Sequence, residues 1–78
     1  MWWFLQKKAD TDERIIYTYG RETKNQTGEI SYNKEKDEFD ILKLADNDTQ
    51  RSAERLLPHL YRVIFNENCP EERQIAIG

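Results

Sequence analysis

Hydrophobic and polar residues alternate along the first half of the chain, and a period of two is typical of β-strands. Bulky apolar residues predict a first strand from Trp2 to Lys7. A second strand follows over Arg14 to Tyr19, after a predicted turn at Asp10 to Glu13, where short polar side chains cap local backbone groups. Gly20 comes directly after this run, and we expect it to mark a bulge or a bend.

Two further strands are predicted on either side of a charged hairpin tip. Residues Glu29 to Asn33 alternate again, and Lys34 to Asp37 form the tip. The fourth strand runs from Glu38 to Leu44, but its apolar positions change from odd to even numbers after Ile41. Such a change of phase indicates a β-bulge, because one extra residue turns every later side chain to the other face. The alternative is that both faces of the sheet are partly covered there.

From Gln50 to Phe65 the period becomes that of an α-helix, preceded by good N-cap residues at Asp46 to Thr49. At about 100° per residue, the apolar stripe holds Ala53, Leu56, Leu57, Leu60, Val63 and Ile64, and Arg51, Arg55 and Arg62 lie opposite. Pro58 lies on the polar face and lacks the N–H that would bond to Glu54. We therefore predict one kinked helix rather than two helices.

A short fifth strand is predicted from Arg73 to Ile77, after Pro70 has ended the helical segment. The apolar helix face must pack on one face of the sheet. The sequence therefore predicts an α+β fold, a two-layer sandwich in which an antiparallel four-stranded meander is packed by one helix. The element order is β-β-β-β-α-β, and the edge that the last strand joins is left open.

The chain has 78 residues and a mass of 9.4 kDa, which predicts a single domain over residues 1–78. A domain of this size buries only about 60% of the surface that its unfolded chain exposes, so it often needs an additional source of stability, such as a disulfide, a metal ion or a partner chain. Cys69 and His59 are the only residues of their kinds, so neither an internal disulfide nor a four-ligand structural zinc site can form. Oligomerisation is the remaining source of additional stability, and we expect a homo-oligomer.

Charge and hydropathy argue against several classes of partner. Twelve basic and fifteen acidic residues alternate along the chain and give a net charge of -3, which disfavours nucleic acid. No run approaches the ~18 apolar residues of a membrane span. The apolar run at residues 1–5 precedes Lys7 and Lys8, which is the wrong order for a secretory signal, so we expect a cytoplasmic protein.

Candidate chemistry is sparse, and we expect a protein that is not an enzyme and holds no metal or cofactor. The three glycines cannot form a phosphate-binding loop. His59 and Cys69 could suggest nucleophilic catalysis, but Cys69 follows the end of the helix, where the dipole disfavours a thiolate. The carboxylates of the hairpin around Glu35 to Asp40 are explained by a solvated turn, and those at Asp46 and Asp48 by N-capping.

Aromatic residues provide the strongest hint of function. Three of them are consecutive, so a strand there must direct large apolar side chains to both faces, whereas one helix covers one face. Tyrosines of the second and third strands extend one of these stripes. We predict an interaction surface formed by Trp2, Trp3, Phe4, Tyr17, Tyr19 and Tyr32. The alternative for most of them is a place in the core beneath the helix.

The sequence therefore favours a non-catalytic module that binds protein, either a second copy of itself or a larger chain, through an aromatic sheet surface. Contacts to an acidic partner or an anion are assigned to Arg51, Arg55 and Arg62. A small-molecule binding domain with weak hydrolytic activity is the alternative, in which Tyr17, Tyr32 and an arginine line a pocket between helix and sheet. A third is a domain cut from a longer chain.

Overall fold

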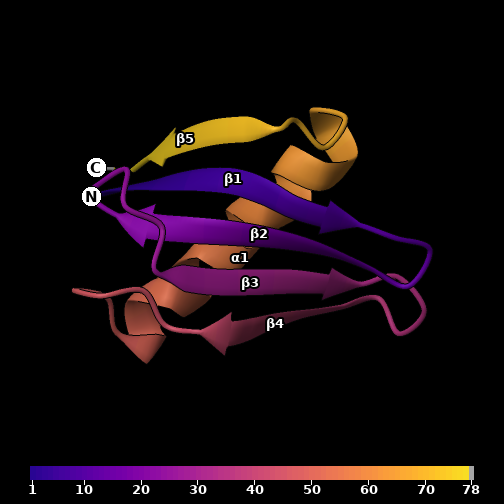
Figure 1. Ribbon diagram of the computed structural model, residues 1–78, viewed down its shortest axis with the longest axis horizontal. Coiled ribbons are helices and arrows are strands. Elements are labelled where there is room, and N and C mark those ends of the chain that lie inside the picture. The colour runs from indigo at the N-terminus through magenta and orange to yellow at the C-terminus, as the bar shows by residue number, and fades with distance from the viewer. Residues whose placement is uncertain (78) are drawn as a thin grey trace.

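Within residues 1–77, five strands form one antiparallel sheet, and a single helix packs against one of its faces (Figure 1). The computed structural model describes residues 1–77. The elements are β1 (Trp2–Asp10), β2 (Arg14–Arg21), β3 (Gly28–Asn33), β4 (Glu38–Lys43), α1 (Gln50–Asn66) and β5 (Glu72–Ala76). In space the strands follow the order β4-β3-β2-β1-β5. The predicted α+β sandwich, with a four-stranded meander, one helix and a fifth strand, is confirmed.

The fifth strand takes the edge beside β1, so the first strand lies between β2 and β5. Hydrogen bonds between β1 and β5 continue past the last paired residues of both strands. The Met1 ammonium donates to the Ile77 carbonyl oxygen at 3.0 Å, and the Ile77 amide donates to the Met1 carbonyl oxygen at 2.8 Å. The edge that the sequence left open is therefore occupied, and β4 and β5 are the two strands with one free side.

The helix begins at a side-chain cap, as predicted. The Thr49 hydroxyl accepts a hydrogen bond from the Ser52 amide at 3.1 Å, which satisfies one of the free N–H groups of the first turn. The helix then continues without interruption through Pro58. It crosses the sheet diagonally, from the C-terminal end of β4 toward β5 (Figure 1). This diagonal course leaves one corner of the sheet without a helix above it.

The core lies between the sheet and the helix. It is formed by Trp3, Leu5, Ile15, Tyr17, Tyr19, Ile30, Tyr32, Ala45, Ala53, Leu56, Leu60, Val63, Ile64 and Ile75. Two of its phenols find hydrogen-bond partners: the Tyr19 hydroxyl accepts from the Ala45 amide at 3.1 Å, and the Tyr17 hydroxyl donates to the Pro70 carbonyl oxygen. Burial raises the pKa of Tyr19 to about 12, so this phenol stays protonated at neutral pH.

The predicted bulge in the fourth strand is present. Ile41 pairs with Ile30 and Lys43 pairs with Glu29, so Leu42 is an extra residue with no partner in this register. The extra residue explains the change of phase in the hydrophobic pattern. It also interrupts the regular geometry of an edge strand, since β4 has a neighbour on one side only.

The bulge or bend expected at Gly20 is wrong. Gly20 pairs with Phe4 in regular register, and the irregularity in this pair of strands lies between Lys7 and Ala9 of β1. Glycine is needed for another reason. A Cβ at this position would overlap the Asn25 carbonyl oxygen, because the connection between β2 and β3, residues 22–27, folds back onto the sheet at this point.

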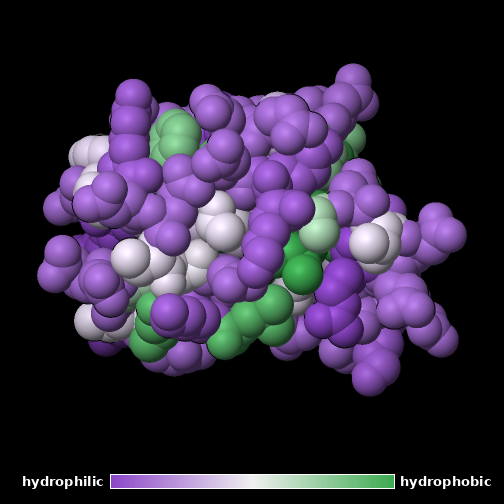
Figure 2. All heavy atoms as spheres, in the orientation of Figure 1, coloured by the Kyte–Doolittle hydropathy of each residue, from purple (hydrophilic) through white to green (hydrophobic). Residues whose placement is uncertain are grey.

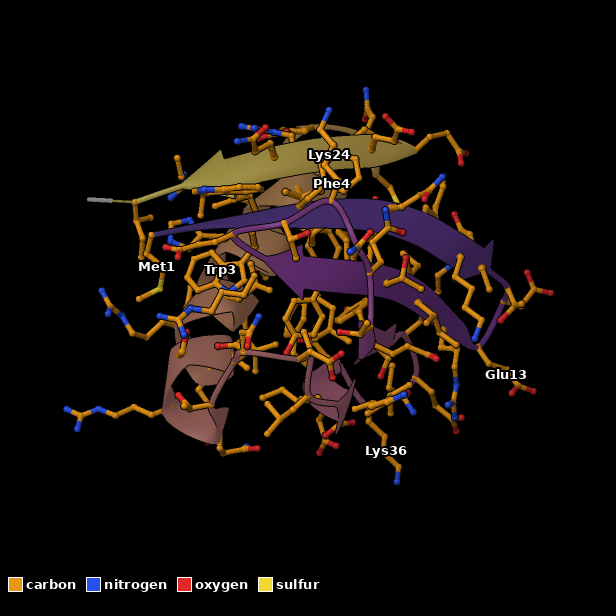
Figure 3. The ribbon with its side chains drawn as sticks, turned by 60° about the vertical axis from the view of Figure 1, so that its left-hand side comes forward. Met1, Trp3, Phe4, Glu13, Lys24 and Lys36 are labelled. Carbon is orange, nitrogen blue, oxygen red and sulfur yellow. The ribbon has the colours of Figure 1, made fainter. Side chains whose placement is uncertain are left out.

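This connection covers part of the sheet face that the helix leaves bare. The Thr18 hydroxyl donates to the Gln26 side-chain oxygen at 2.7 Å, and the Lys24 ammonium lies 5.8 Å from the centre of the Phe4 ring (Figure 3). The same face is mainly hydrophilic at its surface (Figure 2). The expectation that nothing within the chain covers this face is therefore corrected. In the part of the chain described here, α1 lacks the length and apolar character that crossing a bilayer requires.

Candidate interaction surface

The aromatic residues predicted to form an interaction surface are divided between two environments. Trp3, Tyr17, Tyr19 and Tyr32 point toward the helix and are buried in the core, whereas Trp2 and Phe4 are half-buried on the opposite face. The strand does direct large rings to both faces. The tyrosine stripe is the core under the helix, the second of the two alternatives, because α1 lies over it. Four of the six predicted residues are thus out of reach of a partner.

The exposed aromatic surface lies elsewhere, at the corner that the diagonal helix leaves uncovered. There the β3–β4 hairpin and the flank of α1 present five apolar side chains, which we call the aromatic corner: Phe39, Leu57, Pro58, Tyr61 and Phe65. Tyr61 retains 50% of its accessible surface and Phe65 retains 47%. Large exposed apolar residues that lie together commonly mark interaction sites.

The rings of the aromatic corner are packed against one another and against the core. Tyr32 lies at the base, with its ring centre 4.7 Å from that of Phe39 and 5.2 Å from that of Phe65, the latter edge-on. Tyr61 continues the array, 4.7 Å from Phe65 and 6.0 Å from Phe39. These separations are typical of favourable aromatic pairs. The corner is therefore a preorganised surface rather than a set of independent side chains.

A hydrogen bond fixes the base of this array. The Tyr32 hydroxyl donates to the Asp37 carboxylate at 2.6 Å, and this bond raises the pKa of Tyr32. Asp37 has a left-handed backbone conformation in the turn between β3 and β4, with φ of 54°. The turn is thereby tied to the corner, which holds Phe39 in place two residues later.

A groove of about 490 Å³ runs along the aromatic corner and opens to solvent. It is lined by Phe39, Glu54, Leu57, Pro58 and Tyr61. The pocket considered in the sequence analysis would place Tyr17 and Tyr32 in its wall, but neither residue lines this groove. The lining is apolar with a single carboxylate.

Charged side chains border the aromatic corner on both sides. On one side, Glu38 and Asp40 alternate with Phe39 along β4 and are exposed. On the other side, Arg55 lies three residues before Pro58 and Arg62 four residues after it, so both lie near Pro58 on the helix surface. We call these groups the acidic border (Asp37, Glu38 and Asp40) and the basic ridge (Arg51, Arg55 and Arg62). The six ion pairs found within residues 1–77 engage none of them. The three arginines thus form the exposed ridge that the sequence predicts.

A second, smaller hollow of about 90 Å³ lies between α1 and β5. Its lining includes His59, Arg62, Glu67 and Arg73. The Arg73 guanidinium donates to the Glu67 carboxylate at 2.6 Å, so these two charges neutralise each other. Burial lowers the pKa of His59, and the positive charges of Arg62 and Arg55 lower it further. The imidazole is therefore held in its neutral form near pH 7.

We predict that His59 titrates below the ordinary value of about 6.5. Neutral His59 contributes stability that is complete above pH 6.5 and is lost as the pH falls through the lower pKa of the folded state. NMR titration of the imidazole checks the midpoint, and urea unfolding at pH 7.5 and 5.5 checks the linkage. Arg62→Gln should move the midpoint upward. A midpoint at or above 6.5 in the parent protein would contradict the prediction.

The two residues considered for nucleophilic catalysis have different surroundings. Cys69 lies beside Tyr17, with 3.4 Å between the sulfur and the phenol oxygen, and its carbonyl oxygen accepts from the Lys7 ammonium at 3.0 Å. His59 instead lines the hollow next to β5. Residues 1–77 contain no cluster of three or more His, Cys, Asp or Glu side chains that could hold a metal ion.

The aromatic corner could have been found from the helical pattern. Leu57, Tyr61 and Phe65 are spaced by four residues, so they extend the apolar stripe to one flank of the helix. The apolar stripe predicted from the sequence includes Leu57 but neither Tyr61 nor Phe65. Comparison with protein-family models, with curated proteins and with solved structures finds no match to this chain. The function must therefore be inferred from this surface.

Proposed function

We propose that this chain is a non-catalytic protein–protein interaction module that binds its partner through the aromatic corner. The observation that carries the proposal is the array of packed rings of Phe39, Tyr61 and Phe65, of which the last two are half-exposed, beside a mainly apolar groove. Aromatic residues are enriched at the centres of protein interfaces, where a few of them supply most of the binding energy.

The energetics of a small domain support this proposal. Full burial of a side chain such as phenylalanine is worth roughly 1.5–3 kcal/mol, and Tyr61 and Phe65 each leave about half of their surface in water. A partner that covers them recovers part of this free energy. Because the rings are already packed together, little side-chain freedom is lost on binding.

The groove supports the small-molecule alternative less well. Sites for small ligands bury most of the ligand surface and converge several polar groups on it. This groove is open, and Glu54 is the single charged residue of its lining. For the location we propose the cytosol.

The test compares a corner variant with a matched control. We expect Tyr61→Lys with Phe65→Lys to abolish binding, because both positions are half-exposed and charge there opposes burial without disturbing the core. Leu42→Lys is the control, since Leu42 is 47% exposed, as Phe65 is, and lies at the β4 bulge outside the corner. Affinity capture from native cytosol and sedimentation of the purified proteins are the measurements. Undiminished binding by the corner variant would refute the proposal.

A further inference from the structure

We infer that the partner seated on the aromatic corner is a second copy of this chain, related by a two-fold axis that runs along the groove. This inference rests on the proposed function and specifies its partner. The charges on the two sides of the corner have opposite signs and face solvent.

The two charged groups flank the apolar surface in a fixed order. Seen from the β4 edge, the surface presents the basic ridge, then Pro58 and Tyr61 with the single groove carboxylate of Glu54, and then Phe39. The acidic border follows beyond the β4 backbone, because Glu38 and Asp40 alternate with Phe39 and point to the other face of the sheet. Apart from the bond between Tyr32 and Asp37, which ties the turn to the corner, the ridge and border make no side-chain hydrogen bond within residues 1–77. Their charges are free to engage a partner.

A surface of this kind is complementary to itself. Rotation by 180° about an axis along the groove places the basic ridge of one copy against the acidic border of the other, twice, while the two aromatic corners meet at the centre. A partner of a single charge sign would instead meet like charge on one side. The charge distribution therefore selects a copy of the same chain.

Edge-to-edge pairing of β4 is a poorer way to join two copies. The bulge at Leu42 interrupts the edge, and an antiparallel register centred on Asp40 would place two carboxylates opposite each other. A stable contact usually buries about 800 Å² per partner, which would cover roughly one sixth of the 4848 Å² surface of this chain.

A charge exchange tests the inference. One variant carries Arg55→Glu and Arg62→Glu, so negative charges dominate both borders of its corner although Arg51 remains. The other carries Glu38→Lys and Asp40→Lys, so positive charges dominate both borders. We expect each variant alone to dimerise at least about tenfold more weakly than the parent, because attraction becomes repulsion at both symmetric contacts. An equimolar mixture should recover dimerisation, since every contact is then between opposite charges.

Analytical ultracentrifugation from about 10 µM to 1 mM measures dimerisation, and circular dichroism confirms that the exposed changes leave the fold intact. Glu72→Lys, on the opposite edge strand, is the control and should dimerise as the parent does. If the mixture fails to dimerise, the arrangement in which the basic ridge of each copy faces the acidic border of the other is overturned. If the parent protein stays monomeric at 1 mM, the inference that the partner is a second copy is overturned. The proposed function would still stand if the parent protein captures another protein and the variant with Tyr61→Lys and Phe65→Lys does not.

Discussion

Replacing Trp3 with alanine is expected to lower the free energy of unfolding by about 3–5 kcal/mol, the largest effect of any single substitution considered for this protein. The Trp3 side chain is completely buried between β1 and α1. Its removal leaves a cavity that the surrounding tyrosines and leucines fill only in part. Domains of this length have a total stability of roughly 4–12 kcal/mol, so the loss is a large fraction of the whole.

Two neighbouring substitutions act as controls for this prediction. Trp2→Ala removes the same side chain from the opposite face of the same strand, where it is half-buried, and should cost clearly less. Trp3→Phe keeps a ring in the core and removes an indole N–H that has no acceptor among residues 1–77, so it should cost less than Trp3→Ala. Urea unfolding followed by circular dichroism ranks the three variants. Equal losses of unfolding free energy for Trp2→Ala and Trp3→Ala would contradict the prediction that the face under the helix contributes more stability than the opposite face.

Gly28→Ala is expected to be the second most damaging change, with a loss of about 3 kcal/mol from overpacking and a broken hydrogen bond. A Cβ at Gly28 would overlap the Tyr19 ring and lie 2.6 Å from the Ala45 amide nitrogen. The same ring holds that amide through its hydroxyl, so the added methyl group must displace one partner of a buried hydrogen bond.

Gly20→Ala is the comparison for this second prediction. Its Cβ would meet carbonyl oxygens of Thr23 and Asn25, at 2.7 Å from the former, and these belong to a surface connection that can shift. We expect a smaller loss there. Thermal unfolding measures both variants, and hydrogen exchange at the Ala45 amide reports the broken bond in Gly28→Ala. If Gly28→Ala lowers the stability less than Gly20→Ala does, the prediction is contradicted.

The fold could be predicted because its elements are encoded by short-range patterns. Bulky apolar residues predicted β1 and alternation predicted β2 to β4. The shift of apolar positions after Ile41 located the bulge, and the cluster before Gln50 located the N-cap. The role of Gly20 could not be predicted, because its need for a small side chain comes from a loop that folds onto it. That contact joins residues whose approach depends on the whole sheet.

The candidate surface was predicted less well, for a geometric reason. The sequence implied exposed aromatic residues but could not give the angle at which the helix crosses the sheet. That angle covers Tyr17 and Tyr19 and exposes Tyr61 and Phe65. Tyrosines in strands and in helices have the same hydrophobicity, so composition cannot distinguish them. The basic ridge was predicted correctly as a set of exposed residues, because helical spacing alone decides it.

The position of β1 between β2 and β5 determines when this protein can finish folding during synthesis. β1 is synthesised before β5, so one of its sides has no neighbour until Glu72 to Ala76 have followed it. A nascent chain that has already made β2 therefore still offers a row of free amide and carbonyl groups to other strands. β5 follows every other element along the chain and closes this side, so the sheet is completed only after β5 has been synthesised.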